Sequence, residues 1–283
     1  MSKSLGTGMN PLGLIDVYGA DATRYGLMKM ASAQDVRFAE GAIEEGRKLA
    51  NKLWNVSRLI IQASEGATPA ERPRTLEERW ILARLSQSQR ELERLLAEFD
   101  FSHLAGELYH LTFDDFCDWY AESVKQRLYD GDADARATAV AALERLLKLL
   151  HPVLPHVTEE IWTALPDRSS RLIVSPWPEA GDESEAGALI ELQDSAEIFR
   201  RSGVQPKGLD DERQRIFDAV VKPERVRANG DVEAERARLR EEIERATKML
   251  ANERFVARAP EAVVQAEREK LERYRRELDA ISD

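Results

Sequence analysis

The sequence has one cysteine, no long apolar run and no excess of positive charge. Its single thiol, Cys117, excludes an internal disulfide and any zinc site built from several cysteines, and fits a reducing cytoplasm. Asp115 and Asp118 are expected to raise the pKa of this thiol, so it should not act as a nucleophile. No apolar run is long enough to cross a bilayer, and no basic segment followed by an apolar one opens the chain. We therefore expect a cytoplasmic protein without membrane contact.

The net charge of −11 argues against DNA binding, or any nucleic-acid binding through overall potential, because such binding normally requires a basic surface. Local basic patches must carry any RNA contact. The four histidines, His103, His110, His151 and His156, have no carboxylate or cysteine partner at metal-ligand spacing in the sequence. We therefore expect no metal site at them.

Helical periodicity covers most of the chain. Asn10 followed by Pro11 predicts a helix start, and Asp21 is predicted to cap the next helix. Amphipathic helices joined by short loops are typical of an antiparallel bundle, so we expect an all-α fold. The predicted helices span residues 11–17, 21–31, 40–62, 76–98, 101–124, 133–150 and 158–165. Four tryptophans on apolar stripes are assigned to the core: Trp54, Trp80, Trp119 and Trp162.

The last fifty residues have their own pattern. Apolar residues recur every three or four positions over 232–250 and again over 264–281, with charged residues between them. Two such helices joined at Phe255 to Pro260 predict an antiparallel coiled-coil hairpin. The repeat alone favours a generic coiled coil for protein association.

Short motifs along the whole chain carry a family resemblance. In chain order they include Ser2-Lys3-Ser4 with Gly6 and Gly8, Tyr18-Gly19-Ala20-Asp21, Asn51-Lys52-Leu53-Trp54-Asn55, Arg79-Trp80-Ile81-Leu82, Phe116-Cys117-Asp118-Trp119-Tyr120 and Leu150-His151-Pro152. Their order and spacing resemble those of valyl-tRNA synthetases, which are class I aminoacyl-tRNA synthetases. Isoleucyl and leucyl enzymes share part of this set. The segment 250–260 followed by Val263-Val264 resembles the tip of the valyl family's coiled-coil tRNA arm and separates the valyl family from those relatives.

The resemblance implies four regions. Residues 1–38 are similar to the end of a catalytic domain, with its lysine-bearing loop and stem-contact helices. Residues 39–178 resemble a class I anticodon-binding helical bundle, and residues 231–283 resemble the coiled-coil tRNA-binding arm. Between them, residues 179–230 are expected to form a compact helical or mixed connector.

Several residues are implied as functional. Lys3, between Ser2 and Ser4, is similar to the last lysine of the family's Lys-Met-Ser-Lys-Ser loop, so its implied role is catalytic, through charge stabilisation on the phosphates of ATP. ATP would be a substrate, with Mg in the intact enzyme, and no cofactor is expected on this chain alone. The residues predicted to contact tRNA are Arg47, Lys52, Asn55 and Arg58 in the bundle and Arg254, Arg258 and Arg273 in the arm.

The implied function is that of the C-terminal tRNA-binding part of a ligase that attaches valine to tRNA(Val) using ATP. The domain that holds ATP and valine would precede Met1, so we expect the chain alone to bind tRNA as a monomer without catalysis. Two alternatives stay open. One is a stand-alone tRNA-binding paralogue without chemistry, and the other is a helical scaffold whose coiled coil mediates protein association.

Overall fold

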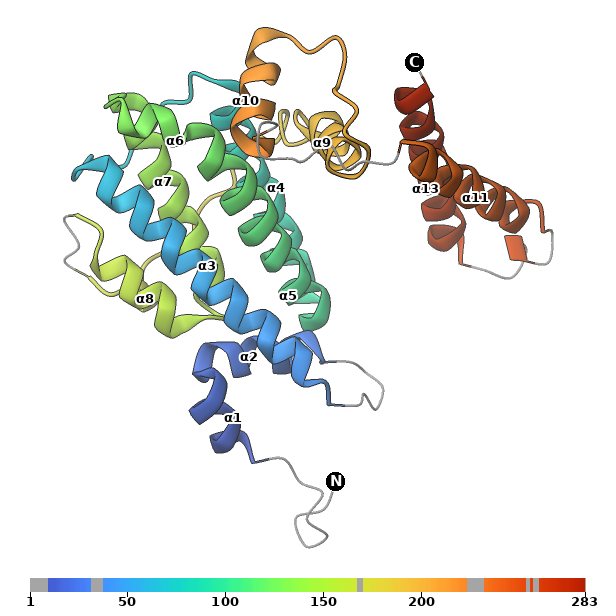
Figure 1. Ribbon diagram of the computed structural model, residues 1–283. Coiled ribbons are helices and arrows are strands. Elements are labelled where there is room, and N and C mark those ends of the chain that lie inside the picture. Colours follow the sequence, from blue (N-terminus) through green and yellow to red (C-terminus); the bar gives the residue numbers. More distant parts are fainter. Residues whose placement is uncertain are drawn as a thin grey trace, which may run out of the picture. The chain divides into compact units, whose positions relative to one another are not determined.

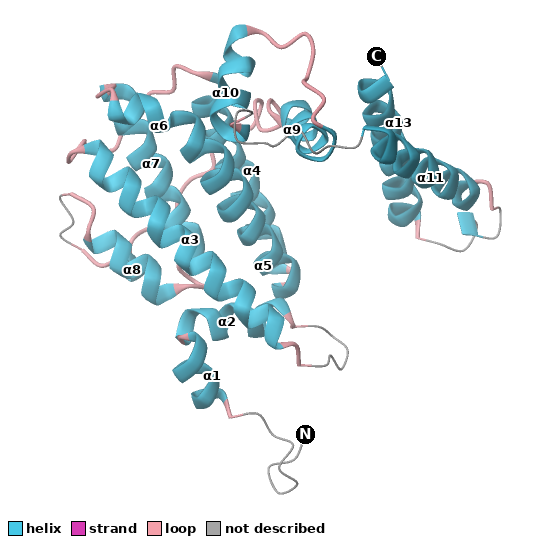
Figure 2. Ribbon diagram, viewed as in Figure 1, coloured by secondary structure: helices cyan, strands magenta, loops and turns pink. Residues whose placement is uncertain are grey.

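The computed structural model describes residues 10–31, 38–166, 170–222, 232–252, 255–256 and 260–282. The chain forms two compact units, Met1–Ala188 and Leu189–Asp283 (Figure 1). Within the described residues every regular element is a helix and no strand is present, which confirms the all-α prediction (Figure 2). None of the described helices is long and apolar enough to span a membrane.

The first unit contains the predicted helices, with ends that differ by five residues at most, at the end of the predicted helix over 101–124. Helix α1 (Pro11–Tyr18) follows Asn10, whose side chain accepts a hydrogen bond from the N–H of Leu12. The predicted helix over 101–124 is one continuous helical run, in which η2 has wider, π-helical turns. The other elements are α2 (Ala20–Lys29), α3 (Glu40–Ser64), α4 (Leu76–Ala97), α5 (Phe101–Tyr109), η2 (His110–Tyr120), α6 (Ala121–Tyr129), α7 (Ala133–Leu150), α8 (Pro155–Thr163) and η3 (Leu172–Val174).

Helix α3 lies in the middle of the first unit, against α2, α6, α7, α8 and η2 (Figure 1). Its buried face includes Ile43 and Leu53, which are fully enclosed. Two glycines allow α2 and α3 to approach closely. A Cβ atom on Gly26 would lie 2.9 Å from the Cα of Ile43, and one on Gly46 would lie 3.0 Å from the carbonyl oxygen of Ala22. The close approach fixes α2 on the N-terminal half of α3.

Three of the four tryptophans assigned to the core are buried, namely Trp80, Trp119 and Trp162. The assignment of Trp54 is wrong, because its side chain is 39% exposed. Trp54 directly follows the buried Leu53, and one residue corresponds to a rotation of about 100° around a helix. The buried face of α3 is therefore narrower than the sequence pattern suggested.

Asp21 is a helix cap, but not of the helix for which it was predicted. The N-cap of α2 is Gly19, and Asp21 lies buried in the first turn of α2. Its carboxylate oxygens accept hydrogen bonds from the backbone N–H groups of His156 at 3.1 Å and Val157 at 2.7 Å. These donors belong to the first turn of α8, so Asp21 caps α8 and joins it to α2.

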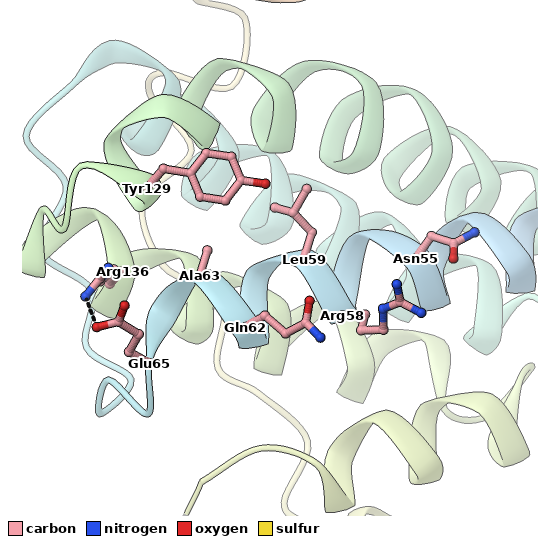
Figure 3. Close-up of a pocket in the computed structure, with 8 residues that line it drawn as sticks. All are labelled: Asn55, Arg58, Leu59, Gln62, Ala63, Glu65, Tyr129 and Arg136. Atoms are coloured by element: carbon pink, nitrogen blue, oxygen red, sulfur yellow. Dashed lines mark hydrogen bonds and ion pairs between the residues drawn. The ribbon is translucent and has the colours of Figure 1, made fainter.

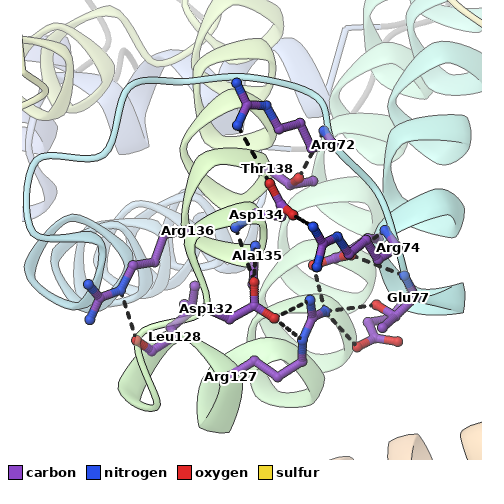
Figure 4. Close-up of polar contacts among 12 residues, drawn as sticks. Arg72, Arg74, Glu77, Arg127, Leu128, Asp132, Asp134, Ala135, Arg136 and Thr138 are labelled. Carbon is purple, nitrogen blue, oxygen red and sulfur yellow. Dashed lines mark hydrogen bonds and ion pairs between the residues drawn. The ribbon is translucent and has the colours of Figure 1, made fainter.

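A polar cluster joins α4, α6 and α7 (Figure 4). Arg127 donates through Nη1 to Oε1 of Glu78 at 2.6 Å, and its Nη2 lies 2.7 Å from Oδ2 of Asp132. Asp132 also caps α7, since its Oδ1 accepts hydrogen bonds from the N–H groups of Asp134 and Ala135, each at 3.1 Å. The cluster fixes the end of α6 against the first turns of α4 and α7.

Cys117 lies in the interior of the first unit. Burial raises the pKa of its thiol to about 12, against an opposing effect of Lys52, while Asp118 and Asp114 raise it further. The predicted direction of the shift is confirmed, but burial rather than nearby charge is the main cause.

The four histidines are all described, and three of them make local side-chain contacts. His103 and His110 each have Nδ1 at 2.7 Å from a carboxylate oxygen, of Asp100 and Asp114 respectively. His151 is held through its Nδ1, 2.8 Å from a threonine hydroxyl. In the described part of the chain, no group of three or more His, Cys, Asp or Glu side chains could hold a metal ion.

The second unit consists of α9 (Ile190–Ser202), α10 (Asp211–Val221), α11 (Val232–Leu250) and α13 (Glu261–Ser282). Helices α9 and α10 belong to the predicted connector, which is helical over these residues. Helices α11 and α13 pack on each other and on α9, where Ile198 and Leu239 form a small core with Tyr274 and Leu278 around it. This pairing is what a hairpin arm requires, and the coiled coil itself stays a prediction.

Candidate functional site

One face of α3 carries a row of five exposed polar side chains. They recur every three or four positions and therefore follow one another along a single face of the helix, over about 22 Å. None of the five makes a hydrogen bond or ion pair with another described residue. We call this set the α3 polar row, and it consists of Arg47, Asn51, Asn55, Arg58 and Gln62.

The start of the α3 polar row lines a hollow of about 430 Å³. Arg47 and Asn51 contribute from α3, His156 from α8, and Tyr18 and Gly19 from the junction of α1 and α2. A Cβ atom on Gly19 would meet nothing within 4 Å, so this side of the hollow is open. The hollow offers a guanidinium and an amide to a polar or anionic group.

The end of the row lines a second hollow, of about 450 Å³ (Figure 3). The last three residues of the row, Asn55, Arg58 and Gln62, reach this hollow from α3. Tyr129 faces it from the end of α6. Leu59 and Ala63 supply apolar surface between them. Arg136 of α7 lies at the edge, where its Nη1 is 3.0 Å from Oε2 of Glu65. We call this the Tyr129 hollow.

Lys52 was predicted to contact tRNA, and the structure gives it internal partners. Its Nζ lies 2.6 Å from Oδ1 of Asp118 and 3.2 Å from the centre of the Phe113 ring. Both partners belong to η2, and the Lys52 side chain is 21% exposed. Lys52 thus stands apart from Arg47, Asn55 and Arg58, which the structure brings together in the polar row.

The sequence-based prediction missed three residues of this surface. Asn51 and Gln62 could have been found, because the spacing that joins Arg47, Asn55 and Arg58 passes through both. Tyr129 could not, since it lies on another helix and only the fold brings it to α3.

The predicted catalytic residues Ser2, Lys3 and Ser4 lie outside the described residues, as do Arg254 and Arg258 of the predicted arm. Arg273 is described. It is exposed on α13, where its Nε lies 3.7 Å from Oε1 of the buried Glu277. Arg273 therefore belongs to the base of the arm, where α9, α11 and α13 meet.

Comparison with known proteins finds two family matches along the chain, both of them C-terminal to α3. The family described as the anticodon-binding domain of tRNA ligase matches residues 78–243, more than half of the chain. The family described as the valyl tRNA synthetase tRNA binding arm matches residues 231–283. The first match covers much of the bundle, and the second covers α11 and α13.

Curated relatives extend the similarity over the rest of the chain. The valine–tRNA ligase of Enterococcus faecalis is 34% identical over 349 residues, which cover 100% of this chain and 40% of the relative. The valine–tRNA ligase of Bacillus subtilis is 32% identical over 346 residues, which cover 99% of this chain and 39% of the relative. The chain thus spans about 40% of the length of these relatives, over their C-terminal part.

A solved structure supports the fold. The LeuRS–tRNA–LeuAMS ternary complex of Agrobacterium radiobacter K84 is similar with a TM-score of 0.52 at 20% sequence identity, over 66% of this chain and 22% of that one. At this identity the likeness concerns the fold alone. The two family matches and their order along the sequence show that the chain belongs to the family of tRNA-ligase anticodon-binding domains, and the curated relatives show that it corresponds to the C-terminal part of valine–tRNA ligases.

Proposed function

We propose that this chain is the tRNA-binding part of a valine–tRNA ligase, an enzyme that attaches valine to tRNA(Val) using ATP. The observation that carries the proposal is the order of two RNA-binding family matches along one chain, a bundle followed by an arm. The α3 polar row, which has no partner among the described residues, supports it independently, because it is an exposed surface of amides and guanidinium groups in a protein whose net charge is −11.

The bundle would bind the anticodon loop through α3. Single-stranded bases are recognised by hydrogen bonds to their edges and by stacking, and the row supplies groups for the hydrogen bonds. Arg47, Asn55 and Arg58 are the predicted contacts that lie in the row. Lys52 would contribute only after release from Asp118, so its predicted contact is the one that the geometry supports least.

The arm would bind the body of the tRNA through phosphates and shape rather than through base identity. Arg254 and Arg258, at the predicted hairpin tip, and Arg273, near its base, are the residues proposed for this contact. Because acidic residues nearly balance the basic ones along the arm, the attraction must be local. We propose that the protein acts as a cytoplasmic monomer.

The catalytic contribution of the chain would come from its first residues. Lys3, with Ser2 and Ser4, would stabilise the charge that develops on the phosphates of ATP. In the intact enzyme ATP would be a substrate accompanied by Mg. In an intact ligase, replacement of Lys3 by alanine is expected to lower the rate of valine activation by about 10² to 10³. The chain alone should not activate valine, because one lysine cannot hold ATP and valine in register.

Equilibrium binding to tRNA tests the proposal. We expect the purified chain to bind a tRNA(Val) transcript more tightly than the same transcript with a substituted anticodon, and to bind both more weakly as salt increases. Valine-dependent pyrophosphate exchange by the same preparation would show that the chain carries its own active site. Self-association without any tRNA binding would support the scaffold alternative and overturn the proposal.

A further inference from the structure

The Tyr129 hollow has an aromatic wall that nothing in the described residues covers. Tyr129 is the last residue of α6, and its side chain is 59% exposed. The polar cluster around Arg127 and Asp132 fixes this end of α6, so the position of the ring is set by the bundle. An exposed aromatic ring on a fixed backbone can stack on a flat partner at little entropic cost.

The rim of the hollow is polar and open to new partners. Asn55 and Gln62 carry amides that can each donate and accept hydrogen bonds, which allows them to read the edge of a base. The Arg58 guanidinium has no partner among the described residues and can pair with a phosphate. Arg136 differs from Arg58, because it is held by Glu65 at 3.0 Å and by the carbonyl oxygen of Leu128 at 3.1 Å.

The size of the hollow also limits its occupant. About 450 Å³ is at the small end of the range for ligand pockets in proteins, enough for one base with part of its backbone. Single-stranded RNA is bound in proteins by stacking of bases on aromatic side chains, combined with cationic groups along the backbone. The Tyr129 hollow contains both of these components within one unit.

We infer that the Tyr129 hollow holds one unstacked base of the tRNA anticodon loop, stacked on the Tyr129 ring, with its edge on Asn55 and Gln62 and its phosphate on Arg58. The inference rests on the proposed function and deepens it, since it assigns a single nucleotide to a named place on the bundle. Tyr129 is then a base-stacking residue that contributes affinity, whereas the amides of Asn55 and Gln62 read the edge of the base.

The experiment couples Tyr129 variants to a scan of the RNA. Transcripts of tRNA(Val) with one abasic nucleotide at each position of the anticodon loop are bound to the wild-type chain, to Tyr129→Leu and to Tyr129→Phe. Leucine keeps apolar bulk without the aromatic face, whereas phenylalanine keeps the face. Phe99→Ala is the matched control, since Phe99 is an exposed aromatic residue of the same unit, 77% exposed, outside the hollow. Thermal unfolding shows that each variant is folded.

We expect Tyr129→Leu to weaken binding of intact tRNA by about tenfold, the effect of losing one base–aromatic stack. Tyr129→Phe and Phe99→Ala should bind like the wild type. The effect of Tyr129→Leu should vanish for the transcript that is abasic at one particular loop position, and remain at the others. This non-additivity identifies the base in the hollow.

Two results would overturn the inference while leaving the proposed function intact. One is wild-type affinity of Tyr129→Leu for intact tRNA, and the other is an equal loss for every abasic transcript. If the wild-type chain binds no tRNA at all, the proposed function fails, and the inference fails with it.

Discussion

The ammonium nitrogen of Lys52 lies 2.6 Å from a carboxylate oxygen of Asp118, and the same nitrogen lies 3.2 Å from the centre of the Phe113 ring. Lysine, aspartate and phenylalanine thus form one contact between α3 and η2. The ammonium group therefore makes two favourable interactions, a cation–π contact with the ring and an ion pair with the carboxylate. Lys52, which the sequence predicted as an RNA contact, is therefore also a contact between helices.

Replacement of Lys52 by glutamate is expected to destabilise the first unit by about 1 kcal/mol or more, because two carboxylates would then face each other at a site that is only 21% exposed on the lysine side. Urea unfolding followed by tryptophan fluorescence measures this loss. All five tryptophans lie before residue 178, so the signal reports on the first unit.

The charge-swapped double variant, Lys52→Glu with Asp118→Lys, separates structure from binding. If the role of Lys52 is structural, the swap should recover most of the lost stability and the tRNA affinity together. Recovered stability with weak tRNA binding would instead show that the Lys52 charge contacts the RNA, as the sequence predicted.

Replacement of Asp21 by alanine is expected to lower the stability of the first unit by about 1 to 2 kcal/mol, since it removes the cap of α8 and leaves two backbone N–H groups without their acceptor. Asp21→Asn should cost less, because the amide oxygen can still accept. Asp16→Ala, at an exposed aspartate of α1, is the control and should change little. A neutral Asp21→Ala variant would show that the contact between α2 and α8 does not support the fold.

The Cys117 thiol is expected to resist alkylation and disulfide exchange in the folded protein. A pKa near 12 leaves about one thiolate in 10⁴ molecules at pH 8, and the thiolate is the reactive form. Titration with a chromogenic disulfide should give no rapid reaction in native buffer and one reactive thiol per chain in guanidinium chloride. Complete modification of the native protein within minutes would mean that the interior around η2 opens readily.

The helices could be predicted from the sequence because helical periodicity is local. The predicted helix over 133–150 has the ends that α7 has, where Asp132 caps the first turn. The role of Asp21 could not be predicted in the same way. A residue that favours helix starts does not reveal which helix it caps, and the donors at His156 and Val157 are more than a hundred residues away in the chain.

The candidate site was also predictable only where it depends on spacing within one helix. Arg47, Asn55 and Arg58 share one face of α3 by spacing alone, and the structure places them there. Tyr129 joins them only because α6 packs on α3, and Lys52 is drawn away by side chains of η2. Contacts between helices decide which basic groups stay free. These contacts cannot be predicted from the spacing of residues within one helix.

The basic side chains on helix α13 of the arm differ in whether they form an ion pair with a described residue. Arg268 and Arg275 are exposed, stand seven positions apart on one face, and make no hydrogen bond or ion pair with another described residue. Lys270 differs, because its Nζ lies 3.8 Å from Oε2 of Glu267. Free guanidinium groups can neutralise phosphates at full charge, whereas a paired lysine must first give up its partner.

The double variant Arg268→Ala with Arg275→Ala is therefore expected to weaken tRNA binding and to reduce the slope of log affinity against log salt by about one to two, because each lost phosphate contact removes a little under one unit. Lys270→Ala, the matched control, should leave the slope nearly unchanged. The preference for the correct anticodon should survive in both, since the proposed base contacts lie in the bundle. If the double variant keeps the wild-type affinity and slope but shifts an oligomer to a monomer in light scattering, the arm serves protein association, and the proposed contact between this helix and tRNA is wrong.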